Sequence, residues 1–330
     1  MKKLMIFSLV LTMVISSMLT GCGSTEEAKL ETVVLNEVAH SIFYAPLYVA
    51  IENGYFEDEG IELELVTGFG ADKTMTALLT DEADIGFMGP ESTIYTYLGG
   101  VDDVVVNFAQ LTQRAGNFLV AREEITDFSW SDLVGATVIG GRAGGMPQMV
   151  FEYILKQNNL VMGEDLVVDQ SIDFGATAAA FSGGFGDYTV EFEPYATSLE
   201  EIGDGYVVAS LGEESGYVPY TAFSAKESYM EENPEIMTAF IAAVKKGVAY
   251  VEEHTAEEIA EVIQPQFEET ETSSLTAIVA RYQAQDTWKA DLVFEEDAFI
   301  LLQNILEEAG ELAQRVPYED LVTTEYVIED

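Results

Sequence analysis

Residues 40–65 read HSIFYAPLYVAIENGYFEDEGIELEL, a helical segment that leads directly into an alternating one. A helix is predicted at 45–53, where Pro46 suits the first turn. Apolar residues then alternate with acidic ones at 61–66, which predicts a strand, and TVVLN at 32–36 predicts another strand before the helix. A strand, a helix and a second strand in this order indicate an α/β fold with a parallel sheet.

The same alternation continues to about residue 225. Further strands are predicted at 84–88, 103–110, 117–121, 136–140, 166–169, 206–210 and 218–223. Further helices are predicted at 71–80, 91–98, 146–158 and 175–182. Beyond them the pattern is helical alone, with helices starting at Asn233–Pro234 and after the capping residue Thr255, and two more at 273–284 and 295–309. These last helices predict a coat over the α/β part.

The charge of the chain excludes a large class of partners. Among 330 residues, 59 are acidic and 14 basic, which gives a net charge of −45. Such a chain repels phosphate, so we expect no nucleic-acid binding. Its 48% of apolar and 11% of aromatic residues nevertheless indicate a folded protein.

The N-terminus reads as a sorting signal. Two lysines precede an uncharged apolar run at 4–20, and LTG then leads into Cys22. This arrangement resembles the bacterial lipoprotein box, in which the cysteine is acylated and becomes the new N-terminus. We therefore expect residues 1–21 to be a signal peptide, Cys22 to carry the lipid, and residues 22–30 to tether an extracytoplasmic protein to the cell membrane. The alternatives are a short membrane span and a secretory signal with an incidental cysteine.

Catalytic and metal motifs are rejected in turn. The sequence has two histidines and one cysteine, so a three-histidine zinc site, a disulfide and a thiolate metal site in the mature protein are excluded. The run GFGADKT at 68–74 is not a phosphate loop, because Asp72 would repel a nucleotide. We expect no enzyme, no metal and no cofactor.

Turns that follow the predicted strands carry the candidate binding residues. In α/β sheets a ligand lies beyond the carboxyl ends of the strands. The turn residues in question are His40, Ser41, Phe43 and Tyr44 after the first strand, Gly68, Gly70, Asp72 and Lys73 after the second, Gly89, Pro90 and Glu91 after the third, and Gly140 to Met146, with Arg142, Gly144 and Gly145, in the second half. Each turn alone is typical of an ordinary connection. Their recurrence at the same end of successive strands predicts a cleft.

Four motifs in order resemble one protein family. They are the opening stretch at 40–65, ADIGFMGPES at 83–92, FEP at 192–194 and NPEIMTAFIAAVKKGVAYV at 233–251. Together they resemble the solute-binding proteins of ABC importers that serve nitrate, sulfonates, taurine and thiamine-pyrimidine precursors. The resemblance spans about residues 31–320. In this family a small residue is more usual where Tyr188 stands, which predicts a narrower pocket or a stacking surface.

The resemblance implies a two-lobed α/β architecture, the periplasmic-binding-protein type II fold, with a mostly parallel sheet flanked by helices in each lobe and a helical C-terminal coat. Lobe 1 would comprise 31–116 and 222–330, and lobe 2 would comprise 117–221, with crossings near 114–118 and 218–223. It also implies a monomer that closes on a small solute and docks on a permease, which is coupled to a cytoplasmic ATPase.

Two ligand classes remain open on the sequence alone. Lys73, Arg114 and Arg142 favour an anion such as an alkanesulfonate, taurine or nitrate. Aromatic rings and carboxylates instead favour a heteroaromatic or amine-bearing solute of the thiamine-precursor type, and this is the reading we prefer. That second set is Phe43, Tyr44, Phe87, Tyr188, Glu91 and Glu193, in which Phe43 and Phe87 also suit core packing. An envelope enzyme related to pyrimidine synthases and a sensor or structural lipoprotein are further alternatives.

Overall fold

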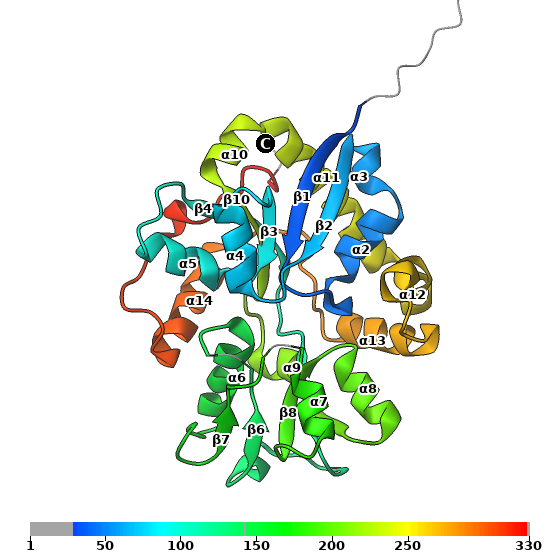
Figure 1. Ribbon diagram of the computed structural model, residues 1–330, viewed down its shortest axis with the longest axis vertical. Coiled ribbons are helices and arrows are strands. Elements are labelled where there is room, and N and C mark those ends of the chain that lie inside the picture. The colour runs from blue at the N-terminus through cyan, green and yellow to red at the C-terminus, as the bar shows by residue number, and fades with distance from the viewer. Residues whose placement is uncertain (1–28, 142, 174, 329–330) are drawn as a thin grey trace, which may run out of the picture. The chain divides into compact units, whose positions relative to one another are not determined.

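Two five-stranded sheets with flanking helices form the part of the chain described by the computed structural model, residues 29–141, 143–173 and 175–328 (Figure 1). The predicted signal peptide, Cys22 and Arg142 lie outside these residues. Within them, no helix has the length and apolar character needed to cross a membrane.

The first sheet has the strand order β2-β1-β3-β10-β4. Its strands are β1 (Glu31–Glu37), β2 (Ile61–Thr67), β3 (Ile85–Met88), β4 (Val105–Thr112) and β10 (Thr221–Lys226). β1 pairs in parallel with β2 and β3, whereas β10 runs antiparallel to β3 and β4. We call this sheet and the helices packed on it lobe 1.

The second sheet repeats the plan with the order β7-β6-β8-β5-β9. Its strands are β5 (Asn117–Ala121), β6 (Thr137–Ile139), β7 (Val167–Asp169), β8 (Tyr188–Phe192) and β9 (Tyr206–Ser210). β6 is parallel to β7 and β8, and β5 is antiparallel to β8 and β9. We call this sheet with its helices lobe 2.

The two α/β lobes confirm the predicted fold class, and both sheets are mixed. The parallel pairs are joined by helices, as parallel connections require. β5 and β10 instead enter their sheets straight from the crossings between the lobes, so no helical crossover fixes their direction. The lobe boundaries, at the predicted crossings near 114–118 and 218–223, remain a prediction.

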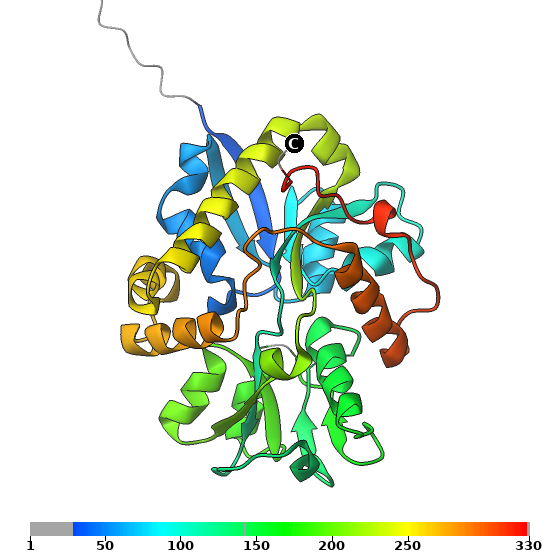
Figure 2. The ribbon, with the colours of Figure 1, turned by 180° about the vertical axis from the view of Figure 1, so that it is seen from behind.

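Helices cover the sheets of both lobes. Lobe 1 carries α2 (Ala45–Glu52), α3 (Tyr55–Asp58), α4 (Ala71–Leu79), α5 (Glu91–Leu98), α10 (Glu227–Glu232), α11 (Pro234–Glu253), α12 (Ala256–Ile263), α13 (Thr272–Ala284) and α14 (Glu296–Ala309). Lobe 2 carries α6 (Met146–Gln157), α7 (Thr177–Ser182), α8 (Tyr195–Ile202) and α9 (Leu211–Ser215). Short 3-10 turns lie at Ile42–Tyr44, Trp130–Leu133, Gln264–Phe267 and Tyr318–Asp320. Figure 2 shows α11 running along the back of the first sheet, where it packs on α2, while α14 reaches α6 of lobe 2.

The contact between α11 and α2 depends on one glycine. A Cβ atom on Gly247 would lie 2.1 Å from the carbonyl oxygen of Pro46, so only glycine allows the two helices this approach. On the same side of the sheet, Phe87 stacks on Phe223 with ring centroids 4.3 Å apart. Phe43 and Phe87 are fully buried, in agreement with core packing.

Two strands differ from the sequence prediction. β8 was not predicted, because its run YTVEF places a charged residue, Glu191, at a buried position. β10 begins at Thr221 rather than at residue 218, because Pro219 has no N–H to donate to a neighbouring strand.

Candidate functional site

A cavity of about 520 Å³ lies between the two lobes. Lobe 1 lines it with the turn after β1, the start and one face of α4, the turn from β3 into α5, and the start of β10; lobe 2 lines it with residues around the start of α6 and with Phe192. The volume falls within the range of about 300–1,000 Å³ that is typical of small-molecule sites. A ligand held here would touch both lobes.

Aromatic side chains form much of the wall. Tyr44, Tyr95, Phe192 and Tyr220 line the cavity. The rings of Phe192 and Tyr220 lie 6.2 Å apart, and the hydroxyl of Tyr95 donates to the carbonyl of Gly144 in the opposite lobe at 3.1 Å. Burial raises the pKa of Tyr44, Tyr95 and Tyr220, so these hydroxyls stay protonated at neutral pH. The cavity therefore offers flat apolar faces edged by hydroxyl groups, of which those of Tyr95 and Tyr220 already donate to Gly144 and Asn117.

Glu91 is the buried carboxylate of the site. It is the first residue of α5 and is 2% exposed. Its Oε1 accepts a hydrogen bond from the backbone N–H of Met146 in lobe 2 at 3.4 Å. Its Oε2 is buried and has no hydrogen-bond partner among the described residues. Burial raises its pKa to about 7, although hydrogen bonds from backbone N–H groups oppose this shift.

Gly89 makes room for this carboxylate. A Cβ atom at position 89 would lie 2.1 Å from Oε2 of Glu91, so any other residue would displace the group. The sequence GPE therefore places an acid inside the cavity because the residue two before it has no side chain.

The described part of the cavity lining contains acidic side chains. Asp72, in the first turn of α4, lines the cavity together with Glu91. Among the lining residues that the structure describes, none is Lys, Arg or His. The charged side chains of the described lining are therefore hydrogen-bond acceptors.

The structure brings many of the predicted turn residues together around the cavity. These are Ser41, Tyr44, Gly70, Asp72, Gly89, Glu91, Gly141, Ala143, Gly144, Gly145 and Met146. Six others do not line it, namely His40, Gly68, Lys73, Arg114, Tyr188 and Glu193. Arg142 lies outside the described residues, although its neighbours Gly141 and Ala143 line the cavity.

His40 and Gly68 support the first lobe next to the cavity. The imidazole of His40 hydrogen-bonds with Glu37 at 2.8 Å and with the carbonyl of Gln266 at 2.9 Å. Burial lowers the pKa of His40, but the bonds to Glu37 and Gln266 outweigh it and raise the pKa overall. A Cβ on Gly68 would lie 2.6 Å from Oδ1 of Asn36, so this glycine allows close packing inside lobe 1.

The predicted cations point elsewhere. Lys73 is exposed on α4. Arg114 donates to the carbonyl of Gly212 at 3.0 Å and lies over the ring of Tyr217, 4.2 Å from its centroid. Arg114 therefore holds the segment that links the lobes.

Tyr188 also lies away from the cavity. It packs within lobe 2 against Phe128, at 6.4 Å between ring centroids.

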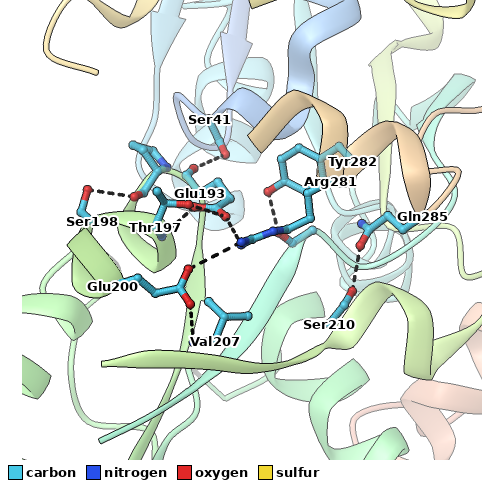
Figure 3. A network of polar contacts seen from close by, with 12 residues as sticks. Ser41, Glu193, Thr197, Ser198, Glu200, Val207, Ser210, Arg281, Tyr282 and Gln285 are labelled. Atoms are coloured by element: carbon cyan, nitrogen blue, oxygen red, sulfur yellow. Dashed lines mark hydrogen bonds and ion pairs between the residues drawn. The ribbon is translucent and has the colours of Figure 1, made fainter. Parts of the chain in front are cut away.

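Glu193 joins the lobes (Figure 3). Its carboxylate pairs with Arg281 of α13 at 2.6 Å, and Arg281 also lies 3.5 Å from Glu200. The hydroxyl of Ser41 donates to the backbone carbonyl of Glu193 at 2.8 Å. Burial raises the pKa of Glu193, and the charge of Arg281 opposes this rise. These contacts connect lobe 1 with lobe 2 beside the cavity.

Sequence reasoning missed several lining side chains. Phe192 stands in the FEP run, in which the predicted site residue was the following Glu193. Tyr220 and Thr221 fall in a predicted crossing, and their proximity to the ligand space would follow only from knowing that β10 joins the middle of the first sheet. Tyr95 gave no signal beyond helical periodicity.

The sequence profile of the NMT1/THI5-like family matches residues 42–258. The chain belongs to this family. It is also 44% identical to "Putative binding protein YtlA" of Bacillus subtilis over 91% of this chain and 90% of that protein. A formylaminopyrimidine-binding protein of Halalkalibacterium halodurans is 27% identical over 86% of this chain and 87% of its own length.

A solved structure shows the same fold at lower identity. The alkanesulfonate-binding protein SsuA of Xanthomonas axonopodis, bound to MOPS, superposes with a TM-score of 0.72 at 15% identity, over 90% of this chain and 99% of SsuA. The predicted resemblance to ABC-importer solute-binding proteins is confirmed, and so is the periplasmic-binding-protein fold. These relatives are named as binding proteins and not as enzymes.

Proposed function

We propose that this NMT1/THI5-like protein captures an amine-bearing heteroaromatic solute, such as an aminopyrimidine, in the cavity between its lobes. It then delivers the solute to the membrane permease of an ABC importer, which a cytoplasmic ATPase drives. The proposal keeps the lobes at 31–116 with 222–330 and at 117–221, and has them close by rotation near 114–118 and 218–223.

The observation that carries this proposal is the buried oxygen of Glu91. A buried polar atom left without a partner costs about 1–3 kcal/mol. An exocyclic amine or a protonated ring nitrogen would donate to this Oε2 and recover that cost. A sulfonate or nitrate has no proton to donate, so its own charge would oppose Glu91.

The aromatic wall supports a flat ligand. Tyr44, Phe192 and Tyr220 present rings to the cavity, and a heteroaromatic ring that stacks on them gains contact area and attraction. Micromolar affinity requires about 8 kcal/mol, which one charge-assisted bond and a desolvated ring pair supply in large part. The 27% identical formylaminopyrimidine-binding protein supports the same ligand class.

Calorimetry with a defined panel tests the ligand class. We expect 4-aminopyrimidine and its methylated derivatives to bind, and an alkanesulfonate without an amine and nitrate to give no heat. Glu91→Gln should weaken the aminopyrimidine at least tenfold, while Glu82→Gln, which changes an exposed acid on lobe 1, should leave its affinity unchanged. Binding of the anions alone would overturn the proposal and point to Arg142.

Delivery and anchoring have separate tests. Small-angle scattering should show a smaller radius of gyration with bound ligand, and an unchanged radius would contradict closure.

Cys22→Ala should release the protein from the cell membrane, and mass spectrometry of the wild-type N-terminus should find an acylated Cys22. Retention of the variant in the membrane fraction would contradict the lipid anchor.

A further inference from the structure

Tyr95 carries a hydrogen bond across the cavity from one lobe to the other. It lies on α5 of lobe 1, and its hydroxyl donates to the carbonyl of Gly144 in lobe 2 at 3.1 Å. Both residues line the cavity. Met149 offers its Sδ to the same hydroxyl at 3.6 Å, but a carbonyl oxygen is the stronger acceptor and lies closer. The bond to Gly144 therefore joins the two walls of the ligand space.

The acceptor belongs to the glycine-rich turn that precedes α6. Gly144 has a φ angle of +79°, which residues with a side chain rarely adopt, so the position of this carbonyl depends on glycine. On the lobe 2 side, the N–H of Gly144 donates to Oε1 of Gln148 in the first turn of α6 at 3.1 Å. The turn is thus held by its own helix on one side and by Tyr95 of the opposite lobe on the other.

Other contacts between the lobes lie beside the chain segment that joins them. Gln285 of α13 donates to the carbonyl of Ala115, within the link between β4 and β5, at 3.3 Å, and accepts from the hydroxyl of Ser210 at 2.7 Å. A rotation about this link moves atoms near it only slightly and moves the cavity walls apart. Opening must therefore break the bond between Tyr95 and Gly144, whereas the contacts of Gln285 can persist.

We propose that Tyr95 is a positioning residue that holds the two lobes together across the cavity and so retains a bound solute. Its bond to Gly144 is made by protein atoms alone, so it stabilises the closed arrangement of the lobes before and after a solute binds. A solute leaves after this bond breaks, so Tyr95 slows release rather than entry. The retention of a solute rests on the proposed function, whereas the closure of the lobes by Tyr95 does not.

Tyr97 is the matched control on the same helix. Its hydroxyl donates to Oδ2 of Asp320 at 2.7 Å, and Asp320 belongs to the 3-10 turn that packs on α14 of lobe 1. Tyr95→Phe and Tyr97→Phe each remove one tyrosine hydroxyl from α5 and keep the ring. Because only Tyr95→Phe removes a bond between the lobes, a difference between the two variants reports on closure.

Distances between spin labels, measured by electron paramagnetic resonance, test closure without any ligand. A Cys22→Ala background removes the one cysteine of the chain, and Glu82→Cys with Gln157→Cys places a label on an exposed position of each lobe. We expect Tyr95→Phe to lower the ratio of short to long label distances about three- to tenfold, the size expected for one hydrogen bond. Tyr97→Phe should leave the distance distribution unchanged. Identical distributions for Tyr95→Phe and its labelled parent would overturn the proposal.

Binding kinetics with 4-aminopyrimidine test the retention of a solute. Tyr95→Phe should release it about three- to tenfold faster than wild type without slower association, and Tyr97→Phe should match wild type. Unchanged release from Tyr95→Phe, or slower association alone, would overturn the role of Tyr95 in retention. If 4-aminopyrimidine does not bind the wild-type protein, the proposed function fails, and the label distances decide by themselves whether Tyr95 holds the lobes together.

Discussion

The pH dependence of stability offers a direct test of the buried state of Glu91. Its pKa is raised from 4.5 to about 7 in the ligand-free fold, chiefly by burial. Between these two values the folded protein binds more protons than the unfolded chain, so stability falls as pH rises through this window. One unit of pKa corresponds to about 1.4 kcal/mol, so the total loss above pH 7 is about 3 kcal/mol.

The substitution Glu91→Gln removes this titration. We expect the difference in unfolding free energy, variant minus wild type, to increase by about 3 kcal/mol from pH 4.5 to pH 7.5 and to level off above that. Urea unfolding of both proteins at half-unit pH intervals, without ligand, measures this difference. Glu191 remains in both proteins, so its own titration cancels.

Glu82→Gln is the control for this series. The residue is exposed on lobe 1, so this variant measures how the loss of a surface carboxyl group changes the same series. A pH-dependent difference for Glu91→Gln no larger than that for Glu82→Gln would refute the reasoning, since it would mean that the carboxyl group of Glu91 is solvated in the ligand-free protein.

Three further substitutions probe the packing and the cavity. Gly247→Ala should destabilise the protein by about 1–3 kcal/mol in urea unfolding, because the new methyl meets the carbonyl of Pro46 and overpacking outweighs the gain in helix propensity. Gly89→Ala should lower aminopyrimidine affinity at least tenfold in calorimetry with native circular dichroism, because it displaces the carboxylate two residues on; unchanged affinity would contradict that placement. Arg281→Met should cost about 1–3 kcal/mol, because it leaves Glu193 buried without its cation, and Glu193→Gln in the same background should recover part of this loss.

The sequence predicted the fold more fully than the site, and the reason lies in the range of the interactions. Helices such as α5 and strands such as β9 follow from local periodicity and capping, which neighbouring residues determine. Glu91 was found because a turn after a strand is a local feature as well. β8 was hidden by Glu191, whose burial depends on hydroxyls from Thr177 and Thr189.

Two of the predicted cations do not line the cavity. Lys73 and Arg114 were predicted site residues because they fall on a predicted cleft turn and a predicted crossing of a very acidic chain. Arg114 instead bonds to a backbone carbonyl, and Lys73 faces solvent. Glu193 bears the family's Glu-Pro motif, yet its partner Arg281 is far away in sequence and no local pattern reveals the pair.

The short link between β4 and β5 has a kinetic consequence. Residues 113–116 alone separate Thr112 from Asn117, and four residues span at most about 14 Å when fully extended. The link therefore limits how far the lobes can separate, so under the proposed function a solute bound to one lobe would meet the other at an effective concentration in the millimolar range or above. Capture would then be one bimolecular encounter followed by an intramolecular step, and only the encounter should depend on the solute concentration.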